Sequence, residues 1–559
     1  MIFNNCGLKK VNKFLWILIL FTVAFNIIFL MRYNFEADSA FYVLLAQEQI
    51  RTGSLFPEGV YYSTGLFILT PNLLVIPFLF LTENLVLARQ SAILLLWVFV
   101  YIILYKVFNT KKEKDLEGFV IASVLFSVFY VNASVVSMHF YQGAYVGYLL
   151  FLFLFLAMMN RIITENNFGK INLAGLLLLY ILANLGDIRN LLIWGIPGFI
   201  AYFLYNVLKS RWNFSFIRNL LEELKLLEIL LLGILLGFIV FKFMARMYGN
   251  DGSTSYMVVL AAKDYGKSFF AIITGLFGLY GNSSESFLFS FNGIMKFINF
   301  FVMIMLNFFI PVFAIKNYYK IKQESSRFLI IFSLISTFIY FIVIFLTGGA
   351  IVEERYLIPI YNNNIVLFAV IGSHILKNQL KNHLSLGVFC IIFYVLLSNI
   401  FYFYNQKDSL LYQKFGAFAE GIEGVTDFLE HRGLKYGYGT FRNAEGYSIL
   451  SNNKVTIRGI LFDQGKLMPF NWLTVNRFYN PNEYIGNSFL MLADDEIKLW
   501  FPTGISSMGL GQPVETIKYK KYTIFVYDYN ISSKFVKGKK VYWLIRGDKN
   551  NSGTYISNE

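Results

Sequence analysis

The sequence has few charged residues. Only 15% of its 559 residues are Asp, Glu, Lys or Arg, and 57% are hydrophobic. Soluble domains carry about 25% charged residues, so this chain has too little charge to cover a water-exposed surface, and most of it must face lipid. The same hydrophobicity excludes an intrinsically disordered chain.

Cysteine is almost absent as well. Cys6 and Cys390 lie in an N-terminal tail and in an apolar run, so the chain has no CxxC motif, no zinc-ligand spacing and no expected disulfide. No internal repeat is found, and the part after residue 405 has neither a glycine-rich phosphate loop nor a Ser/His/Asp arrangement.

What the sequence does contain is a series of long apolar runs. A helix needs about 20 mostly apolar residues to cross the hydrocarbon core of a membrane. The first run is too long for the h-region of a signal peptide and lacks a small-residue cleavage site, so we interpret it as a retained anchor. About eleven spans are predicted, near residues 14–31, 88–108, 118–137, 141–159, 171–186, 191–207, 228–245, 293–315, 328–347, 357–376 and 384–404.

The formal net charge of +14 follows this topology. Lysines before the first span place the N-terminus in the cytoplasm, every even-numbered span then ends in a basic loop, and the opposite loops are poorer in Lys and Arg. The excess charge therefore indicates cytoplasmic loops and not a nucleic-acid partner. An odd number of spans places everything after about residue 405 outside. The basic loops carry Lys111, Lys112, Lys114, Arg161, Lys170, Lys209, Arg211, Arg218, Lys225, Lys316, Lys320, Lys322, Arg327, Lys377 and Lys381.

Residues 32–87 are predicted to form one large first external loop with two helices lying at the membrane interface, near 39–52 and 66–81. The run 66–82 contains Pro71 and Pro77, and counting it as a span would move the basic loop at 109–117 outside. A kinked, tilted span is the alternative.

The composition changes after the last span. Residues 1–404 are predicted to form the membrane domain, and 405–559 an extracytoplasmic α/β domain of common size. The fold class is thus an α-helical polytopic membrane protein with a C-terminal α/β domain. Within that domain we expect helices at 416–432 and 494–501 and strands at 436–441, 454–462, 488–493 and 522–529.

This topology places a small set of ionisable residues on the external rim of the bundle, where charges are costly and tend to be functional. An acid can accept the proton of an attacking hydroxyl, and an arginine can bind a phosphate leaving group with paired donors. Most have a structural alternative: a helix cap or solvated loop residue for Asp38, and a cap or ion pair for Asp187 and Arg189. His139 would be a hydrogen-bonded interface residue, and Glu353, Glu354 and Arg355 would form a solvated loop end. The set is Glu36, Asp38, His139, Asp187, Arg189, Glu353, Glu354 and Arg355.

The arrangement resembles the GT-C superfamily of integral-membrane glycosyltransferases. The acidic motif EADSAFY follows the first span, and a long external loop comes next. LARQSAILL at 87–95 opens the following span, ERYLIP at 354–359 opens a late span, and a soluble external domain closes the chain. The resemblance, to architectures such as those of protein mannosyltransferases and aminoarabinose transferases, implies a polyprenyl-phosphate-linked sugar as donor, inversion, and a cell-surface glycan or glycolipid as acceptor.

The resemblance also assigns roles to residues. Asp38 would be the general base, with Glu36 the less favoured choice. The doubled acid of several members is here split by one residue, so the choice between the two stays open. Some members use a divalent metal such as Mg or Mn, and Asp38 with Asp187 or Glu354 could form such a site. Arg355, Arg89 and Arg189 would bind the donor phosphate, and the substrate cavity would include Asp187, His139, Tyr141, Glu354, Tyr356, Tyr61 and Tyr62.

Two other functions stay open. A transporter or flippase of lipid-linked glycans would show related halves and helices interrupted at mid-membrane. A glycan polymerase of the O-antigen type would carry a large external loop between later spans, and 246–292 is of moderate size. The large external domain favours an enzyme over a transporter. The spans place the protein in the lipid bilayer of the cell membrane, and no nucleic acid is expected as a partner.

Overall fold

The structure is a computed structural model, and the statements below concern the residues that it describes. These are 16–17, 19–31, 37–62, 71–128, 133–166, 168–209, 216–247, 259–281, 289–348, 352–377, 394, 424–463, 466–500, 509–536, 541–542 and 555–556. Glu36, residues 416–423 of one predicted helix, and the predicted span 384–404 apart from residue 394 lie outside them.

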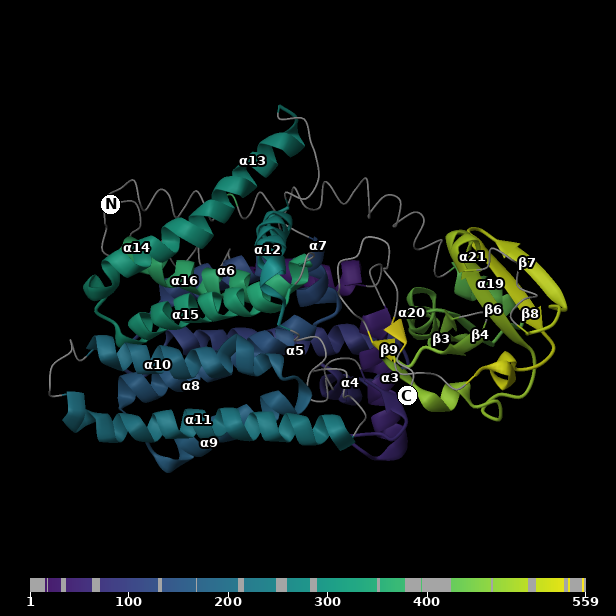
Figure 1. Cartoon of the computed structure of the whole chain (residues 1–559), viewed down its shortest axis with the longest axis horizontal. Helices are drawn as coiled ribbons and strands as arrows, with labels where there is room; N and C mark the ends of the chain where they lie inside the picture. Colours follow the sequence, from purple (N-terminus) through teal and green to yellow (C-terminus); the bar gives the residue numbers. More distant parts are fainter. Residues whose placement is uncertain are drawn as a thin grey trace.

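Long helices run side by side along the long axis of the molecule (Figure 1). Seven described helical segments are long and apolar enough to cross a membrane. The bundle contains η1 (Asn26–Leu30), α5 (Leu85–Phe108), α6 (Leu116–Val128), α7 (Ala133–Val136), η2 (Ser137–Tyr141), α8 (Ala144–Glu165), α9 (Lys170–Gly186), η3 (Leu191–Gly195), α10 (Ile196–Lys209), α11 (Phe216–Met247), η5 (Ala262–Asp264), α12 (Tyr265–Leu279), α13 (Phe291–Ile304), η6 (Met305–Phe309), α14 (Ile310–Asn317), η7 (Tyr318–Lys320), α15 (Glu324–Thr347), η8 (Glu354–Leu357) and α16 (Ile358–Lys377).

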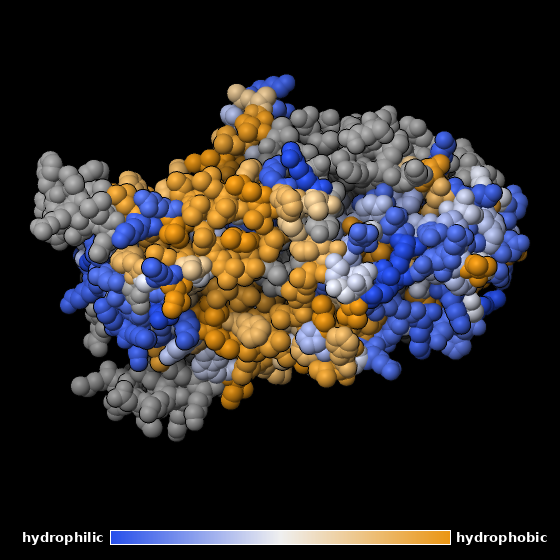
Figure 2. All heavy atoms as spheres, turned by 90° about the horizontal axis from the view of Figure 1, so that it is seen from below, coloured by the Kyte–Doolittle hydropathy of each residue, from blue (hydrophilic) through white to orange (hydrophobic). Residues whose placement is uncertain are grey.

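An apolar belt covers the middle of the bundle, with polar surface on either side of it (Figure 2). Large side chains such as Phe243, Phe270 and Val312 are exposed on these helices. A continuous apolar surface of this kind is unfavourable in water, so it marks the surface that faces lipid, and the chain is a membrane protein.

The loops that the sequence predicts to be basic meet at one end of the bundle. Glu113 accepts hydrogen bonds from the backbone amides of Glu324 and Ser325, at 2.8 and 3.0 Å. The Lys209 ammonium lies 2.9 Å from the Glu324 carboxylate. The loop before α6, the end of α10 and the start of α15 therefore share one end, as the alternation of charge along the chain requires.

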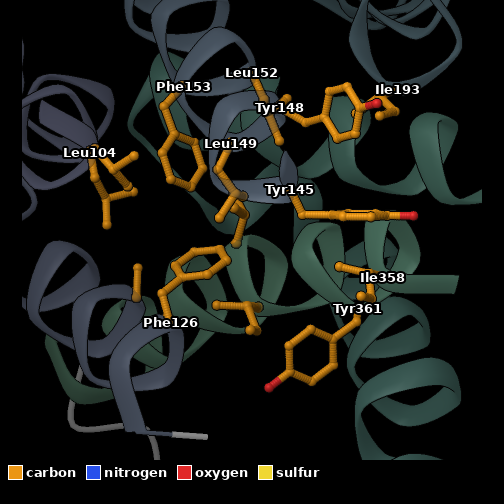
Figure 3. Close-up of a cluster of buried hydrophobic side chains, with 14 of the residues drawn as sticks. Leu104, Phe126, Tyr145, Tyr148, Leu149, Leu152, Phe153, Ile193, Ile358 and Tyr361 are labelled. Carbon is orange, nitrogen blue, oxygen red and sulfur yellow. The ribbon is translucent and has the colours of Figure 1, made fainter. Parts of the chain in front are cut away.

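Between the helices lies one large apolar core. Figure 3 shows a part of it in which Leu104 from α5, Phe126 from α6 and Leu149 from α8 come together. Tyr145 and Tyr148 stand at the edge of this cluster and direct their hydroxyls away from Leu149. One side of α8 thus packs into the core while its first turns present phenol groups to a polar region.

Two features of the predicted first loop take shape. Helix α3 (Ala37–Thr52) confirms the expected helix at 39–52, and α4 (Asn72–Leu79) covers part of the helix expected near 66–81. Eight residues of α-helix are about 12 Å long, too short to cross a membrane. The helix α12 was not predicted; it lies within the stretch 246–292 that we expected to be a loop.

The C-terminal region, residues 424–536, is built around one six-stranded mixed sheet of order β4-β3-β2-β6-β8-β7. Strand β2 pairs in parallel with β3 and β6, and the other pairs are antiparallel. The predicted strands are confirmed, whereas β4 and β7 were not predicted. The elements are α19 (Gly424–His431), β2 (Tyr436–Thr440), η11 (Phe441–Asn443), α20 (Glu445–Leu450), β3 (Thr456–Asp463), β4 (Lys466–Pro469), β5 (Thr474–Val475), η12 (Asn476–Tyr479), β6 (Ser488–Ala493), α21 (Asp494–Trp500), β7 (Glu515–Tyr519), β8 (Tyr522–Tyr527) and η14 (Ile531–Lys534). Two short strands, β9 (Val541–Tyr542) and β10 (Tyr555–Ile556), pair with each other.

The two faces of this sheet pack against different partners, because side chains alternate along a strand. On β6, Phe489 and Met491 belong to a cluster with α19 and α20, whereas Leu490 and Leu492 belong to a cluster that includes Phe41 of α3. The short strand β1 (Val60–Tyr61) pairs antiparallel with β5. The first loop and the C-terminal region are therefore joined by a common core and a strand pair.

Candidate functional site

Asp38 lies in the first turn of α3, where an acidic side chain is favoured by the helix dipole. The side chain of Asp38 is half-buried. The neighbouring Ser39 hydroxyl donates a 3.1 Å hydrogen bond to the carbonyl of Tyr141, which ties this turn to the end of η2. Asp38 is thereby held at the end of the bundle opposite to the basic loops.

Arg89 lies near the start of α5 and is completely buried. Its Nη2 donates to the carbonyl of Gln142, and its guanidinium lies over the ring of Tyr42, 4.5 Å from the centroid. Among the described residues, Nε and Nη1 of Arg89 have no hydrogen-bond partner. Burying charged donors without partners costs several kcal/mol, so these two nitrogens are positioned to bind an anion.

Asp187 and Arg189 form an ion pair in the turn between α9 and η3. The Arg189 Nε lies 3.2 Å from Asp187 Oδ2, and the backbone amide of Arg189 donates to Oδ1 at 2.8 Å. The Tyr148 hydroxyl donates to Oδ2 as well. Burial lowers the pKa of Arg189, but Asp187 and the neighbouring tyrosines together outweigh that effect and hold the pKa well above its usual value. The ion pair that the sequence left as an alternative is therefore present, and the carboxylate also binds a backbone amide of the turn.

The segment before α16 contributes a second ion pair. Arg355 Nε lies 2.5 Å from Glu353 Oε2, and its guanidinium lies 5.4 Å from the centroid of the Tyr356 ring. Glu354, unlike Glu353, contacts α7: its Oε2 accepts a 2.9 Å hydrogen bond from Ser134. A Cβ at Gly278 of α12 would lie 2.2 Å from Glu354 Oε1, so a larger residue there would displace this carboxylate.

Tyr42 stands at the centre of these groups. It is buried on α3, and burial raises its pKa above the usual range while the charge of Arg89 opposes that rise. Asp38, Arg189 and Asp187 also lie within electrostatic range of its phenol. Residues from α3, α5 and the turn after α9 thus converge, as the topology predicted.

Arg355 joins the same group from the other side. Its guanidinium interacts electrostatically with Asp38 and with Tyr145 of α8. Tyr145 in turn lies within range of Arg189 and Asp187. We name Asp38, Arg89, Asp187, Arg189 and Arg355, with the tyrosines among them, the rim cluster.

Four tyrosines of the rim cluster were missed by the sequence analysis. Tyr42, Tyr145, Tyr148 and Tyr340 are all buried and interact with its charged groups. The spacing of Tyr145 and Tyr148, three residues apart on one helix, places both on the same face. The chain contains 37 tyrosines, so a pair at this spacing does not by itself indicate a functional site.

The remaining predicted site residues are distributed differently. Tyr356 belongs to the rim cluster, and Tyr141 borders it through its backbone carbonyl. Tyr61 lies in the strand pair with the C-terminal region, and Tyr62 packs against Phe41. His139 is 1% exposed and packs edge-on against Trp97, well inside the bundle, so the structure does not bring it to the charged groups.

Within the described residues, no set of three or more His, Cys, Asp and Glu side chains is arranged to hold a metal ion. Both carboxylate oxygens of Asp187 already accept hydrogen bonds, and Glu354 is engaged by Ser134. These residues therefore do not fit the metal site that Asp38 was expected to form with one of them, and no step below uses a metal.

Comparison with solved structures identifies the fold. The chain is similar to the crystal structure of ArnT from Cupriavidus metallidurans bound to undecaprenyl phosphate, with a TM-score of 0.53 and 10% sequence identity, over 91% of this chain and 98% of that chain. The apo state of the same protein gives a TM-score of 0.38 at 10% identity, over 93% and 99% of the two chains. No protein-family model and no curated protein sequence matches the chain. The likeness establishes that the chain has the fold of that structure, a helical membrane bundle followed by a C-terminal α/β region, which is the fold class predicted from the sequence.

Proposed function

We propose that this chain, which has the fold of ArnT, is a membrane glycosyltransferase that moves a sugar from a polyprenyl-phosphate donor to a cell-surface glycan or glycolipid on the external face of the membrane. The similar structure holds undecaprenyl phosphate. The observation that carries the proposal is the rim cluster. In it the half-buried Asp38 lies among three arginines, at the end of the bundle remote from the basic loops.

In this proposal Asp38 is the general base. The acceptor hydroxyl attacks the anomeric carbon of the donor, its proton passes to the Asp38 carboxylate, and the bond from that carbon to the phosphate oxygen breaks. Polyprenyl phosphate leaves with the bonding electron pair. A single displacement of this kind inverts the anomeric centre. Glu36 remains the second choice for the base.

Arg89 is the best candidate to bind the donor phosphate. Arg189 and Arg355 each have a carboxylate partner, Asp187 and Glu353, whereas Nε and Nη1 of Arg89 have no hydrogen-bond partner among the described residues. Hydrogen bonds from a guanidinium to a phosphate are charge-assisted and strengthen as charge develops on the leaving group. In this interpretation Arg189 and Arg355 orient the rim cluster and add positive potential around the phosphate.

The test is the variant Asp38→Asn, which keeps the size of the side chain and removes its basicity. With a radiolabelled polyprenyl-phosphate sugar, we expect unchanged donor binding and loss of transfer by about 100-fold or more. Asp264→Asn, an acid at the start of α12 that pairs with Lys267 at 3.6 Å, is the matched control. Full transfer by Asp38→Asn would exclude this residue as the base.

The same assay separates the enzyme from a transporter. Purified protein in detergent has no two aqueous compartments between which a lipid-linked sugar could be moved. Transfer of label to an acceptor glycan under these conditions supports the transferase, and its absence with active donor and acceptor contradicts it.

A further inference from the structure

Helix α3, which carries Asp38, is buried on two opposite sides. One row of its side chains belongs to the core of the membrane bundle, and the other belongs to the core shared with the sheet of the C-terminal region. Rows spaced by three and four residues lie on one face of a helix. The first row is Ala40, Val43 and Ala46, and the second is Phe41, Leu44 and Leu45.

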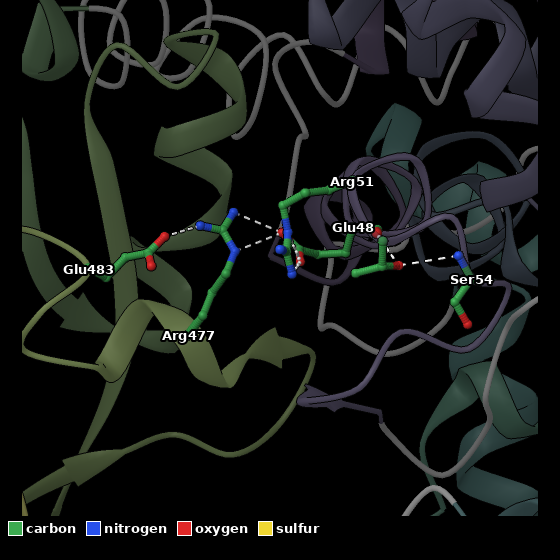
Figure 4. A network of polar contacts seen from close by, with 6 residues as sticks. Glu48, Arg51, Ser54, Arg477 and Glu483 are labelled. Carbon is green, nitrogen blue, oxygen red and sulfur yellow. Dashed lines mark hydrogen bonds and ion pairs between the residues drawn. The ribbon is translucent and has the colours of Figure 1, made fainter.

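The far end of α3 is held by an ion pair that crosses to the C-terminal region (Figure 4). Glu48 is 1% exposed, and its Oε1 accepts hydrogen bonds from Nη2 and Nε of Arg477 at 2.8 and 3.0 Å. Its Oε2 accepts from Arg51 at 2.8 Å. The two hydrogen bonds from Arg477 converge on one oxygen, and Arg51 binds the other, so both oxygens of this buried carboxylate are held by charge-assisted hydrogen bonds.

Arg477 is itself held in place within the C-terminal region. It forms an ion pair with Glu483, and its guanidinium lies 4.1 Å from the centroid of the Phe478 ring. The buried Arg458 lies 3.8 Å from the same ring. Because these contacts within the C-terminal region fix the guanidinium of Arg477, its ion pair with Glu48 can couple the position of the sheet to that of helix α3.

We propose that the Glu48–Arg477 pair positions the catalytic acid, so that the C-terminal region takes part in transfer by fixing α3. Asp38 and Glu48 are ten residues apart, about 15 Å along one continuous helix. A helix of this length moves as a unit, so a tilt at Glu48 displaces Asp38. This inference rests on the proposed function, and it gives the C-terminal region a task in sugar transfer.

Other contacts at this junction keep the two parts assembled when the pair is lost. Strand β1 pairs with β5, and the amide of Leu85 donates a 2.9 Å hydrogen bond to Asn452. The side-chain amide of Asn453 also donates to Oε1 of Gln47 on α3 at 3.4 Å. A variant of Arg477 should therefore fold and keep its domains docked, which separates positioning from simple loss of structure.

The experiment compares Arg477→Met with Arg432→Met in the full-length protein. Arg432 forms an exposed ion pair with Glu515 in the same region, so its loss controls for removal of an arginine. We expect Arg477→Met to lower kcat by about tenfold or more with the donor KM changed less than about twofold, since displacement of a reacting group by about 1 Å has effects of this size. Arg432→Met should match the wild type.

Glu48→Gln and the double variant Glu48→Gln/Arg477→Met complete a double-mutant cycle. If the two residues act as one unit, the double variant loses no more kcat than Arg477→Met alone. An increased donor KM with unchanged kcat would overturn the inference, because it would make Arg477 a binding residue.

Amide hydrogen exchange keeps this inference separate from the proposed function. Loss of the pair should increase exchange of the α3 amides by about tenfold while those of α8 stay protected. If the wild type transfers no sugar, the proposed function fails and the exchange result still tests the coupling. Unchanged exchange in both Arg477→Met and Glu48→Gln contradicts it.

Discussion

At the scale of single residues, the rim cluster contains charges of two kinds. Arg189 is neutralised by Asp187 and Arg355 by Glu353. Arg89 instead offers two buried nitrogens that have no hydrogen-bond partner in the described part of the chain. A buried charge of this kind lowers the stability of the free protein, and a ligand that satisfies it recovers that free energy on binding.

Replacing Arg89 by Met tests this interpretation. Met fills a similar volume without a charge, so we expect the apparent melting temperature to stay equal or rise. Binding of polyprenyl phosphate should weaken by about tenfold or more, because hydrogen bonds to a charged group contribute about 1.5–3 kcal/mol. Thermal unfolding in detergent and titration with the lipid measure the two effects.

The control for Arg89→Met is Arg161→Met, which removes a half-exposed arginine paired with Glu165 near the opposite end of α8. It should leave lipid binding unchanged. If Arg89→Met binds polyprenyl phosphate as the wild type does, another arginine of the rim cluster must hold the phosphate.

Sequence reasoning found the charged residues of the rim cluster but not its tyrosines. Asp38, Asp187 and Arg355 are rare charges beside long apolar runs, and positive loops on the opposite side fix which end they share. Tyr42 and Tyr148 are indistinguishable in sequence from lipid-facing or interfacial tyrosines, because only packing decides which phenols face a carboxylate.

At the scale of elements, helix α20 shows how the C-terminal region buries an acid. Glu445 is 1% exposed, and its Oε1 accepts 3.2 Å hydrogen bonds from the amide of Gly459 and the hydroxyl of Thr474. Burial raises the pKa of Glu445, and the charge of Arg458 opposes that rise. The folded protein therefore holds the proton of this carboxyl more tightly than the unfolded chain does.

This shift sets a sign for the pH dependence of stability. The contribution of Glu445 is fully present below its unfolded pKa, near 4.5, and is lost as the pH rises through the higher folded pKa. Glu445→Gln has no such loss, so its stability relative to the wild type should rise from about pH 4 to pH 7. Melting temperatures across this range measure it. Glu430→Gln, at an exposed pair with Lys454, is the control, and a relative stability that falls with pH contradicts the prediction.

Element boundaries were predictable where one period dominated. The run SFLMLA became β6 at the expected residues, because it is a short apolar run followed directly by the acidic first turn of a helix. Strand β7, with only one buried residue in five, lies at the edge of the sheet and carries no such pattern. Helix α12 was missed because its fifteen residues fall short of a full span.

At the scale of the whole molecule, the two ends of the bundle differ in chemistry. One end gathers the loops around Lys209 and Glu113, and the other gathers the rim cluster and the C-terminal region. The Glu48–Arg477 contact joins residues 429 positions apart. Such a contact leaves no mark in a single sequence, whereas the alternation of basic loops does, so the meeting of these loops at one end was predictable and the junction was not.

The orientation of the molecule in the membrane follows from the same alternation and can be measured directly. Basic loops stay in the cytoplasm, so the loop with the exposed Lys112 should face inward, and the C-terminal region, with the exposed Thr516 on β7, should face outward. In a background with Cys6→Ser and Cys390→Ser, Lys112→Cys and Thr516→Cys each supply one thiol. A membrane-impermeant maleimide applied to intact cells should label Thr516→Cys at once and Lys112→Cys only after permeabilisation. Immediate labelling of Lys112→Cys would place the rim cluster on the cytoplasmic side, where soluble nucleotide sugars are available and a lipid-linked donor is not required.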